Sequence, residues 1–129
     1  MSSRGRSFVG LAAISLLAAT MIGAYASHGM RVAPEESVNA VRTAVAFQFY
    51  HGLALLAVAL LEERLASRWV AAAGALFVAG TVLFCGAIYL DELLGFARAG
   101  AAAPFGGSMF IAGWAALAAA AVISGRRAS

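Results

Sequence analysis

The amino-acid sequence predicts an all-α membrane protein, built as an antiparallel bundle of four transmembrane helices. Of its 129 residues, 63% are hydrophobic and only 12% are charged. A soluble domain carries about 25% charged residues, and one this small could not cover its surface with so few. Four long apolar runs account for the excess, and none of them contains an acid or an arginine. The composition therefore indicates that lipid surrounds most of the chain.

The four runs predict one transmembrane domain over residues 1–129, with spans at about 8–27, 44–61, 69–90 and 105–124. Each run holds about 18–22 residues, enough to cross a hydrocarbon core of about 30 Å at 1.5 Å per residue. Backbone groups in lipid must bond to one another, so each run is expected to be a helix. The runs are rich in Ala, Leu and Gly and lack the alternation of barrel strands.

The connection before the second span predicts a short interfacial helix. Pro34 suits the first turn of a helix, and Glu35 and Glu36 suit its positive end. Apolar side chains then recur at spacings of three and four, at Val38, Val41 and Val45. At the other connection on this side, residues 95–104 are expected to be irregular, with Pro104 opening the fourth helix.

The arginines predict the orientation in the membrane. All nine basic residues are arginines. Six flank one side of the spans: Arg4, Arg6, Arg64, Arg68, Arg126 and Arg127. Three flank the other: Arg31, Arg42 and Arg98. The excess of positive charge on the cytoplasmic side then places both termini in the cytoplasm.

The first span could also be read as a signal peptide. Arg4 and Arg6, an apolar run and Ala24-Tyr25-Ala26 resemble a secretory signal with its cleavage site. The run from residue 8 to 25 is longer than the usual apolar core of about 7–15 residues. The first span is therefore expected to stay on the mature chain, which gives four helices; cleavage would leave three.

A few polar side chains lie in or beside the spans and form the candidate site. They are His28, Gln48, His51, Tyr50 and Ser108. Three interpretations remain open: a hydrogen-bonded cluster that packs helices together, a ligand or metal site that includes haem held by two histidines, and a path for protons or a substrate. Since two imidazoles supply only half of a closed zinc site, no metal is assigned.

The depth of these residues predicts a cluster in the outer half of the bundle. His28 follows the first span, and His51 lies about seven residues into the second span from the same side. Gln48 and His51 are three residues apart and share a helix face. No carboxylate is near to hold an imidazolium, so His51 is expected to be neutral at pH 7. Its expected partner is a group near Gln48, a backbone carbonyl on another helix, Ser108 or Tyr89. Trp114 is expected to pack.

Several functions are disfavoured by the sequence. No catalytic motif is present, so the chain is predicted not to be an enzyme and no cofactor is assigned. The arginines are scattered between apolar runs and form no basic stripe, which disfavours nucleic acid as a partner. The single cysteine, Cys85, lies within an apolar run and cannot form an intramolecular disulfide.

Four segments in order resemble a known membrane family. They are Gly23-Ala24-Tyr25-Ala26-Ser27-His28-Gly29, the run Thr43 to Leu53, the run Leu83 to Leu90, and the run Pro104 to Trp114. Together they resemble the domain of unknown function 423 family, which includes bacterial inner-membrane proteins and eukaryotic transmembrane protein 256. The resemblance spans about residues 10 to 123. It implies four membrane helices, a retained first span and histidines at His28 and His51, and it implies no activity.

Three functions fit these observations. The first is a non-catalytic membrane protein, such as an accessory subunit of a larger membrane assembly. The second is a small oligomeric transporter, although all six acids lie outside the spans and none could couple protons to a substrate. The third is a membrane protein that binds metal or haem through His28 and His51. The partners expected are the lipid bilayer and either further copies of the chain or another membrane protein.

Overall fold

The computed structural model describes the backbone of residues 1–65 and 67–128 and the side chains up to Gly125 outside that gap. Its helices are α1 (Ser3–His28), α2 (Glu35–Leu65), α3 (Arg68–Gly80), the π-helix η1 (Thr81–Cys85), α4 (Gly86–Leu94), the 3₁₀-helix η2 (Ala99–Ala102) and α5 (Ala103–Ala128). The elements α3, η1 and α4 form one continuous rod over Arg68–Leu94. The chain is therefore an all-α protein with four helices long and apolar enough to cross a membrane, as predicted.

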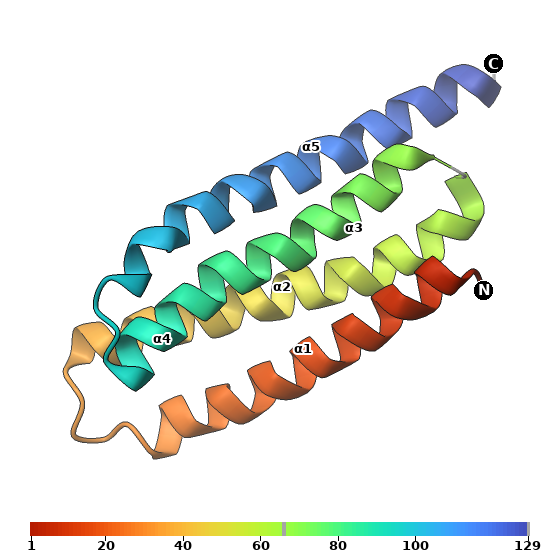
Figure 1. Cartoon of the computed structure of the whole chain (residues 1–129). Coiled ribbons are helices and arrows are strands. Elements are labelled where there is room, and N and C mark those ends of the chain that lie inside the picture. Colours follow the sequence, from red (N-terminus) through yellow and green to blue (C-terminus); the bar gives the residue numbers. More distant parts are fainter. Residues whose placement is uncertain (66, 129) are drawn as a thin grey trace.

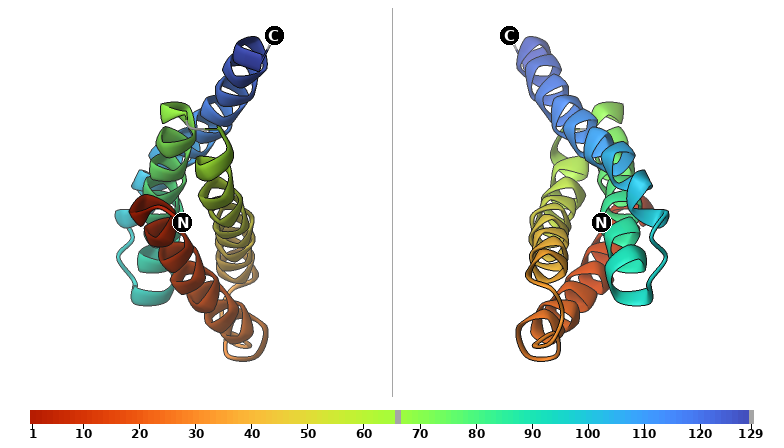
Figure 2. Two further views of the ribbon diagram at one scale, coloured as in Figure 1. Left: turned by 90° about the vertical axis from the view of Figure 1, so that its right-hand side faces the viewer. Right: turned by 90° about the vertical axis from the view of Figure 1, so that its left-hand side faces the viewer.

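The four rods run antiparallel, and both termini lie at the same end of the bundle (Figure 1). The main contacts join α1 to α2, α2 to α3, and α3 to α5. In views that look obliquely along the bundle, α1 and α5 diverge from each other on either side of α2 and α3 (Figure 2). Since α1 and α5 each have one principal neighbour, both expose a wide apolar face, for example at Ile14, Leu17, Ile111 and Val122.

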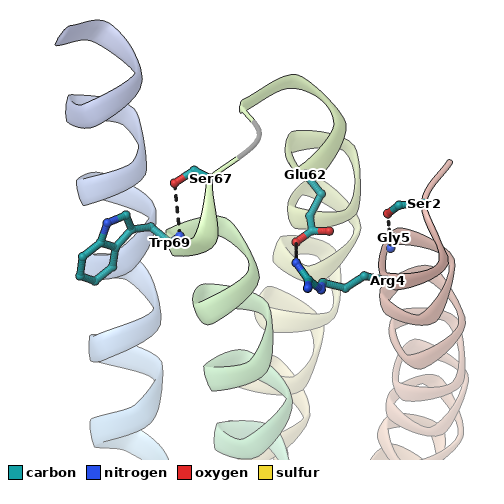
Figure 3. A network of polar contacts seen from close by, with 6 residues as sticks. All are labelled: Ser2, Arg4, Gly5, Glu62, Ser67 and Trp69. Atoms are coloured by element: carbon teal, nitrogen blue, oxygen red, sulfur yellow. Dashed lines mark hydrogen bonds and ion pairs between the residues drawn. The ribbon is translucent and has the colours of Figure 1, made fainter. Parts of the chain in front are cut away.

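Local signals set where the helices begin and end. The Ser2 hydroxyl accepts a hydrogen bond from the Gly5 amide at 2.9 Å, and the Ser67 hydroxyl accepts one from the Trp69 amide at 3.2 Å (Figure 3). These are N-caps, which satisfy amides that have no partner in the first turn. At the other end of the third rod, Gly95 adopts φ 78°, the left-handed conformation that ends α4.

The predicted interfacial helix is not a separate element. The segment is helical, but it continues without interruption into the second span, so that α2 runs for 31 residues from Glu35 to Leu65. Nothing in residues 35–44 breaks a helix, and once nucleated the helix adds a backbone bond with each residue. The prediction that Pro104 lies at the start of the fourth helix is confirmed, since α5 begins at Ala103.

Large side chains fit against glycines where the helices cross. A side chain at Gly74 would collide with the Phe8 ring, one at Gly113 with the Phe77 ring, and one at Gly80 with the Phe110 ring. The approach is closest at Gly106, where a Cβ atom would lie 2.8 Å from the carbonyl oxygen of Gly80 and against the backbone of Phe84. Close backbone packing of this kind holds helices together in lipid, where burial of apolar surface gives no driving force.

The π-helix lies where α5 approaches most closely. Phe84, whose backbone Gly106 contacts, belongs to η1. The extra residue in this turn changes the direction of the side chains after it. These include Cys85 at the end of η1 and Tyr89 in α4. Cys85 consequently donates its thiol hydrogen to the carbonyl oxygen of Ala44 in α2 at 3.2 Å.

Candidate functional site

The side-chain amide of Gln48 joins three helices inside the bundle. It is only 6% exposed. Its Nε2 donates to the carbonyl oxygen of Ser15 in α1 at 2.9 Å and to the Ser15 hydroxyl at 3.2 Å. Its Oε1 accepts a hydrogen bond of 2.6 Å from the hydroxyl of Tyr89 in α4. We call this set of Ser15, Gln48 and Tyr89 the Gln48 bridge. An amide that is satisfied at both ends stabilises the packing of α1, α2 and α4 in lipid.

His51, three residues after Gln48 on a neighbouring part of the same face of α2, bonds to α5. It is 4% exposed. Its Nδ1 lies 2.7 Å from the carbonyl oxygen of Phe47, and its Nε2 lies 3.1 Å from Nε1 of Trp114. A carbonyl can only accept and an indole N–H can only donate, so these partners assign the proton to Nδ1 and the lone pair to Nε2. The geometry therefore corresponds to a neutral imidazole, the form expected from the sequence.

Aromatic rings surround the imidazole. The ring of Phe110 is stacked on it, with centroids 3.6 Å apart and planes 10° apart. The Phe47 ring is nearly parallel to the imidazole, with the ring centroids 6.0 Å apart. The rings of Phe77 and Trp114 are tilted against it, with centroid distances of 5.3 and 5.8 Å. The two nearly parallel rings fix the plane of the imidazole, while Phe47 and Trp114 occupy its two nitrogens through hydrogen bonds.

The expected proximity of His28 to His51 is wrong. Gly23 contacts Val45, and Gly52 contacts Leu16. This antiparallel register places His28 level with residue 40, eleven residues from His51, or about 16 Å at 1.5 Å per residue. His28 is exposed at the C-terminal end of α1. His51 is equally far from Glu62 at the other end, so it lies at mid-depth and not in the outer half.

The remaining candidates, Tyr50 and Ser108, lie together at a groove between α2 and α5. The groove has a volume of about 630 Å³, and six of its lining residues are Tyr50, His51, Phe84, Ser108, Phe110 and Trp114. We call it the α2–α5 groove. Tyr50 is 60% exposed, and the Ser108 hydroxyl donates to the carbonyl oxygen of Pro104 at 3.0 Å within its own helix. The structure thus brings Tyr50, His51 and Ser108 to one surface.

Sequence reasoning missed part of this arrangement. Ser15 was not among the candidate residues, although a serine in the middle of an apolar span must find a partner. Tyr89 was expected near His51, but it bonds to Gln48. Trp114 was expected only to pack, yet its indole N–H donates to His51. The partners of Tyr89 and Trp114 were assigned wrongly because the sequence does not show how neighbouring helices are aligned along their lengths.

The geometry gives no support to a metal or haem site held by two histidines. His28 and His51 are too far apart to share a ligand, and both nitrogens of His51 already have partners. Within residues 1–65 and 67–125, no three side chains of His, Cys, Asp or Glu gather in a way that could hold a metal ion. The polar side chains of Gln48 and His51 therefore form hydrogen bonds between helices.

These features define a small multi-pass membrane protein whose polar side chains bond to one another at mid-depth. The chain belongs to the family described as "Protein of unknown function (DUF423)", which it matches over residues 22–107. The resemblance seen in the sequence is confirmed.

Its relatives carry names that place them in membranes. The chain is 37% identical over 109 residues to UPF0382 membrane protein YwdK of Bacillus subtilis, which covers 83% of this chain and 89% of that protein. It is 34% identical over 110 residues to UPF0382 membrane protein SSP2132 of Staphylococcus saprophyticus, covering 83% and 89%. A fission-yeast relative, UPF0382 membrane protein C1782.12c of Schizosaccharomyces pombe, is 35% identical over 112 residues, covering 81% and 92%. No solved structure matches the chain.

Proposed function

We propose that this protein is a non-catalytic subunit of the bacterial cytoplasmic (inner) membrane, which acts by packing against another integral membrane protein. One observation carries the proposal. Apart from residues 1–2 and three short connections the described chain is helix, and Gln48 and His51 inside the bundle are hydrogen-bonded to neighbouring helices. What remains available to other molecules is the surface that faces the membrane.

The positions of the charged residues support a subunit over a transporter. The acid pairs Glu62–Glu63 and Asp91–Glu92 lie in the last turns of α2 and α4, at the ends of the bundle. A proton-coupled transporter needs an ionisable group within the membrane, and such groups mark substrate or proton pathways where they occur. The described spans place no carboxylate at mid-depth.

The surface of α1 is the best candidate for contact with a partner. Only 17% of its apolar stretch is buried within the chain, against 50% for α2. Ile14, Leu17 and Met21 lie on its exposed face at spacings of three and four. In lipid, helices associate through shape and close packing, so a bulky residue on the contact face should prevent association.

Mass spectrometry of the intact assembly tests this proposal. The full chain, tagged at its C-terminus and produced at its natural level, is extracted in mild detergent and measured without denaturation. The expected result is a fixed ratio of this chain to one different membrane protein. Leu17→Trp should reduce that complex, and Leu53→Trp on the exposed face of α2 is the matched control. A chain that is recovered only as a monomer or as copies of itself would refute the subunit proposal.

The proposal includes an orientation with both termini in the cytoplasm. Arg4, Arg6, Arg64 and Arg68 lie at the end of the bundle that holds both termini. Arg126 and Arg127 follow at the C-terminal end, where the side chains lie outside the described residues. A reporter that is active only in the cytoplasm should work when fused after Ser129. A silent fusion at Ser129 together with an active fusion after Arg98 would show the reverse orientation.

A further inference from the structure

The hydroxyl of Tyr50 differs from the other polar groups at mid-depth. Thr20 and Thr81 bond to carbonyl oxygens in their own helices, and Gln48 and His51 bond across helices. Within the part of the chain that the structure describes, the Tyr50 hydroxyl has no hydrogen-bond partner, and its side chain is 60% exposed. In a membrane this exposure is to lipid, where a hydroxyl without a partner costs free energy. Its surroundings must supply an acceptor.

The groove beside this hydroxyl has the size and the aromatic lining of a small-molecule site. The α2–α5 groove has a volume of about 630 Å³, which lies within the usual range for small-molecule sites of about 300–1,000 Å³. Its walls are the rings of Phe84, Phe110 and Trp114, which favour stacking with another ring. Phe84 belongs to the π-helix, and insertions of this type often occur at functional sites.

Depth decides which kind of molecule can supply the acceptor. Tyr50 precedes His51, which lies near the middle of α2, 16 residues from its first residue and 14 from its last, or more than about 20 Å by helical rise. Polar headgroups of phospholipids stay at the membrane surface, so only their acyl tails reach this level, and tails contain no acceptor. An apolar molecule that carries a carbonyl group on a ring dissolves in the hydrocarbon core and can present its oxygen there.

We propose that the α2–α5 groove binds the head ring of an isoprenoid quinone. The Tyr50 hydroxyl donates to a ring carbonyl, the ring stacks against Trp114, whose side chain is 47% exposed, and the isoprenoid tail leaves along the apolar outer face of α5. The Ser108 hydroxyl, already donating to Pro104, keeps a lone pair for a ring hydroxyl of the reduced form. This is binding without electron transfer, and it does not depend on a protein partner.

Fluorescence of the two tryptophans separates this site from the rest of the surface. Trp114 lines the groove, whereas Trp69 lies at the start of α3, near the end that holds the termini. The full chain in lipid nanodiscs is titrated with decylubiquinone, because quinones quench indole fluorescence at short range. In Trp69→Phe, which keeps Trp114, the quenching should reach a plateau as the decylubiquinone concentration increases. In Trp114→Phe, which keeps Trp69, the quenching should increase linearly with the decylubiquinone concentration. Linear quenching in both variants would refute the site.

Variants of single hydroxyls test the assigned contact. In the Trp69→Phe background, Tyr50→Phe should raise the half-saturating concentration about fivefold, the usual effect of losing one hydrogen bond. Tyr25→Phe is the matched control, since Tyr25 is also exposed but lies near the end of α1, and it should leave the curve unchanged. A Tyr50→Phe curve that superimposes on the parent curve would overturn the proposal.

Two other occupants of the groove have distinct signatures. If the groove takes acyl chains in general, decanol should displace decylubiquinone and reverse the saturable quenching of Trp114. If a second copy of the chain covers it, Ser108→Cys combined with Cys85→Ser should form a disulfide-linked dimer in oxidised membranes. Either result would refute quinone binding; resistance to decanol and a monomeric Ser108→Cys chain support it.

Discussion

The two outer helices of the bundle are held in different ways. On one side, α1 is joined to α2 by polar contacts at two depths: the Gln48 bridge in the middle and an ion pair of 3.3 Å between Arg4 and Glu62 at the end (Figure 3). On the other side, α5 packs on α3 and η1 chiefly through glycines, with Gly106 against backbone and Gly113 against the Phe77 ring. Polar bonds thus add to the glycine contacts that position α1, whereas α5 is positioned chiefly by close packing.

This difference determines what each helix tolerates. A hydrogen bond in lipid selects a partner because the alternative is an unsatisfied group, but it accepts small shifts of the helix. A glycine contact leaves no room for an added atom, so it is sensitive to any side chain. Substitutions should therefore damage the α5 side most by adding atoms and the α1 side most by removing polar ones.

The largest effect is expected at Gly106. In Gly106→Ala, the new Cβ would meet the backbone of Phe84 and the carbonyl oxygen of Gly80, neither of which can rotate away. Overpacking of this kind costs about 3 kcal/mol of unfolding free energy. Gly107→Ala is the matched control, because its Cβ would meet the Phe84 ring at an ordinary 3.9 Å. Thermal unfolding in detergent compares the two, and equal midpoints would show that shape does not hold α5.

A somewhat smaller loss is expected on the α1 side. Gln48→Leu removes the contacts to Ser15 and Tyr89 and leaves the tyrosine hydroxyl without a partner. We expect a cost of about 2 kcal/mol, two or three times an average hydrogen bond in a membrane bundle. Tyr89→Phe should lose about half of that, and the two effects should not add, because they remove the same bond. Tyr50→Phe is the control with an unbonded hydroxyl. Additive losses for Gln48 and Tyr89 would contradict the bridge.

The sequence could predict the helices because composition determines them. The apolar runs lie inside helices that extend beyond them, such as Glu35–Leu65 around residues 44–61. That extension explains the error over His51: its depth was counted from Ala44, whereas α2 begins at Glu35. Where polar residues interrupt an apolar run, as at Gln48, the sequence also indicates a contact. It cannot give the partner, since that depends on the register between helices.

The contacts of α5 could not be read from the sequence for a different reason. Glycine and phenylalanine are frequent throughout the chain, and nothing local distinguishes Gly106 from Gly107. Only the position of α3 shows which of them meets a backbone. The π-helix at Thr81–Cys85 arises at the same contact and has no signal of its own in these residues.

Within the described residues, one side-chain hydrogen bond joins α5 to another helix, and it should contribute less than the Gln48 bridge. His51→Leu removes the acceptor for the Trp114 indole and the stacked ring on Phe110, at an expected cost of about 1 kcal/mol. In a double-mutant cycle with Trp114→Phe, the coupling measures this bond alone. Added zinc ion or haem should change the thermal midpoint of neither the parent nor His51→Leu. A rise in the parent that His51→Leu abolishes would show that His51 ligates the added group.

The smallest effect is expected at the ion pair between Arg4 and Glu62. The two side chains meet at the end of the bundle, where Arg4 is largely exposed although Glu62 is only 8% exposed. Exposed ion pairs contribute about 0.2–1 kcal/mol, and salt at about 1 M screens them strongly. Arg4→Gln should therefore lower the thermal midpoint slightly at low salt and hardly at all at high salt. Arg6→Gln is the control, because Arg6 forms no ion pair within the described residues. The loss in Gln48→Leu should not change with salt, since its partners are neutral and buried in lipid. If both variants responded equally to salt, the distinction between a bridge at mid-depth and a pair at the surface would fail.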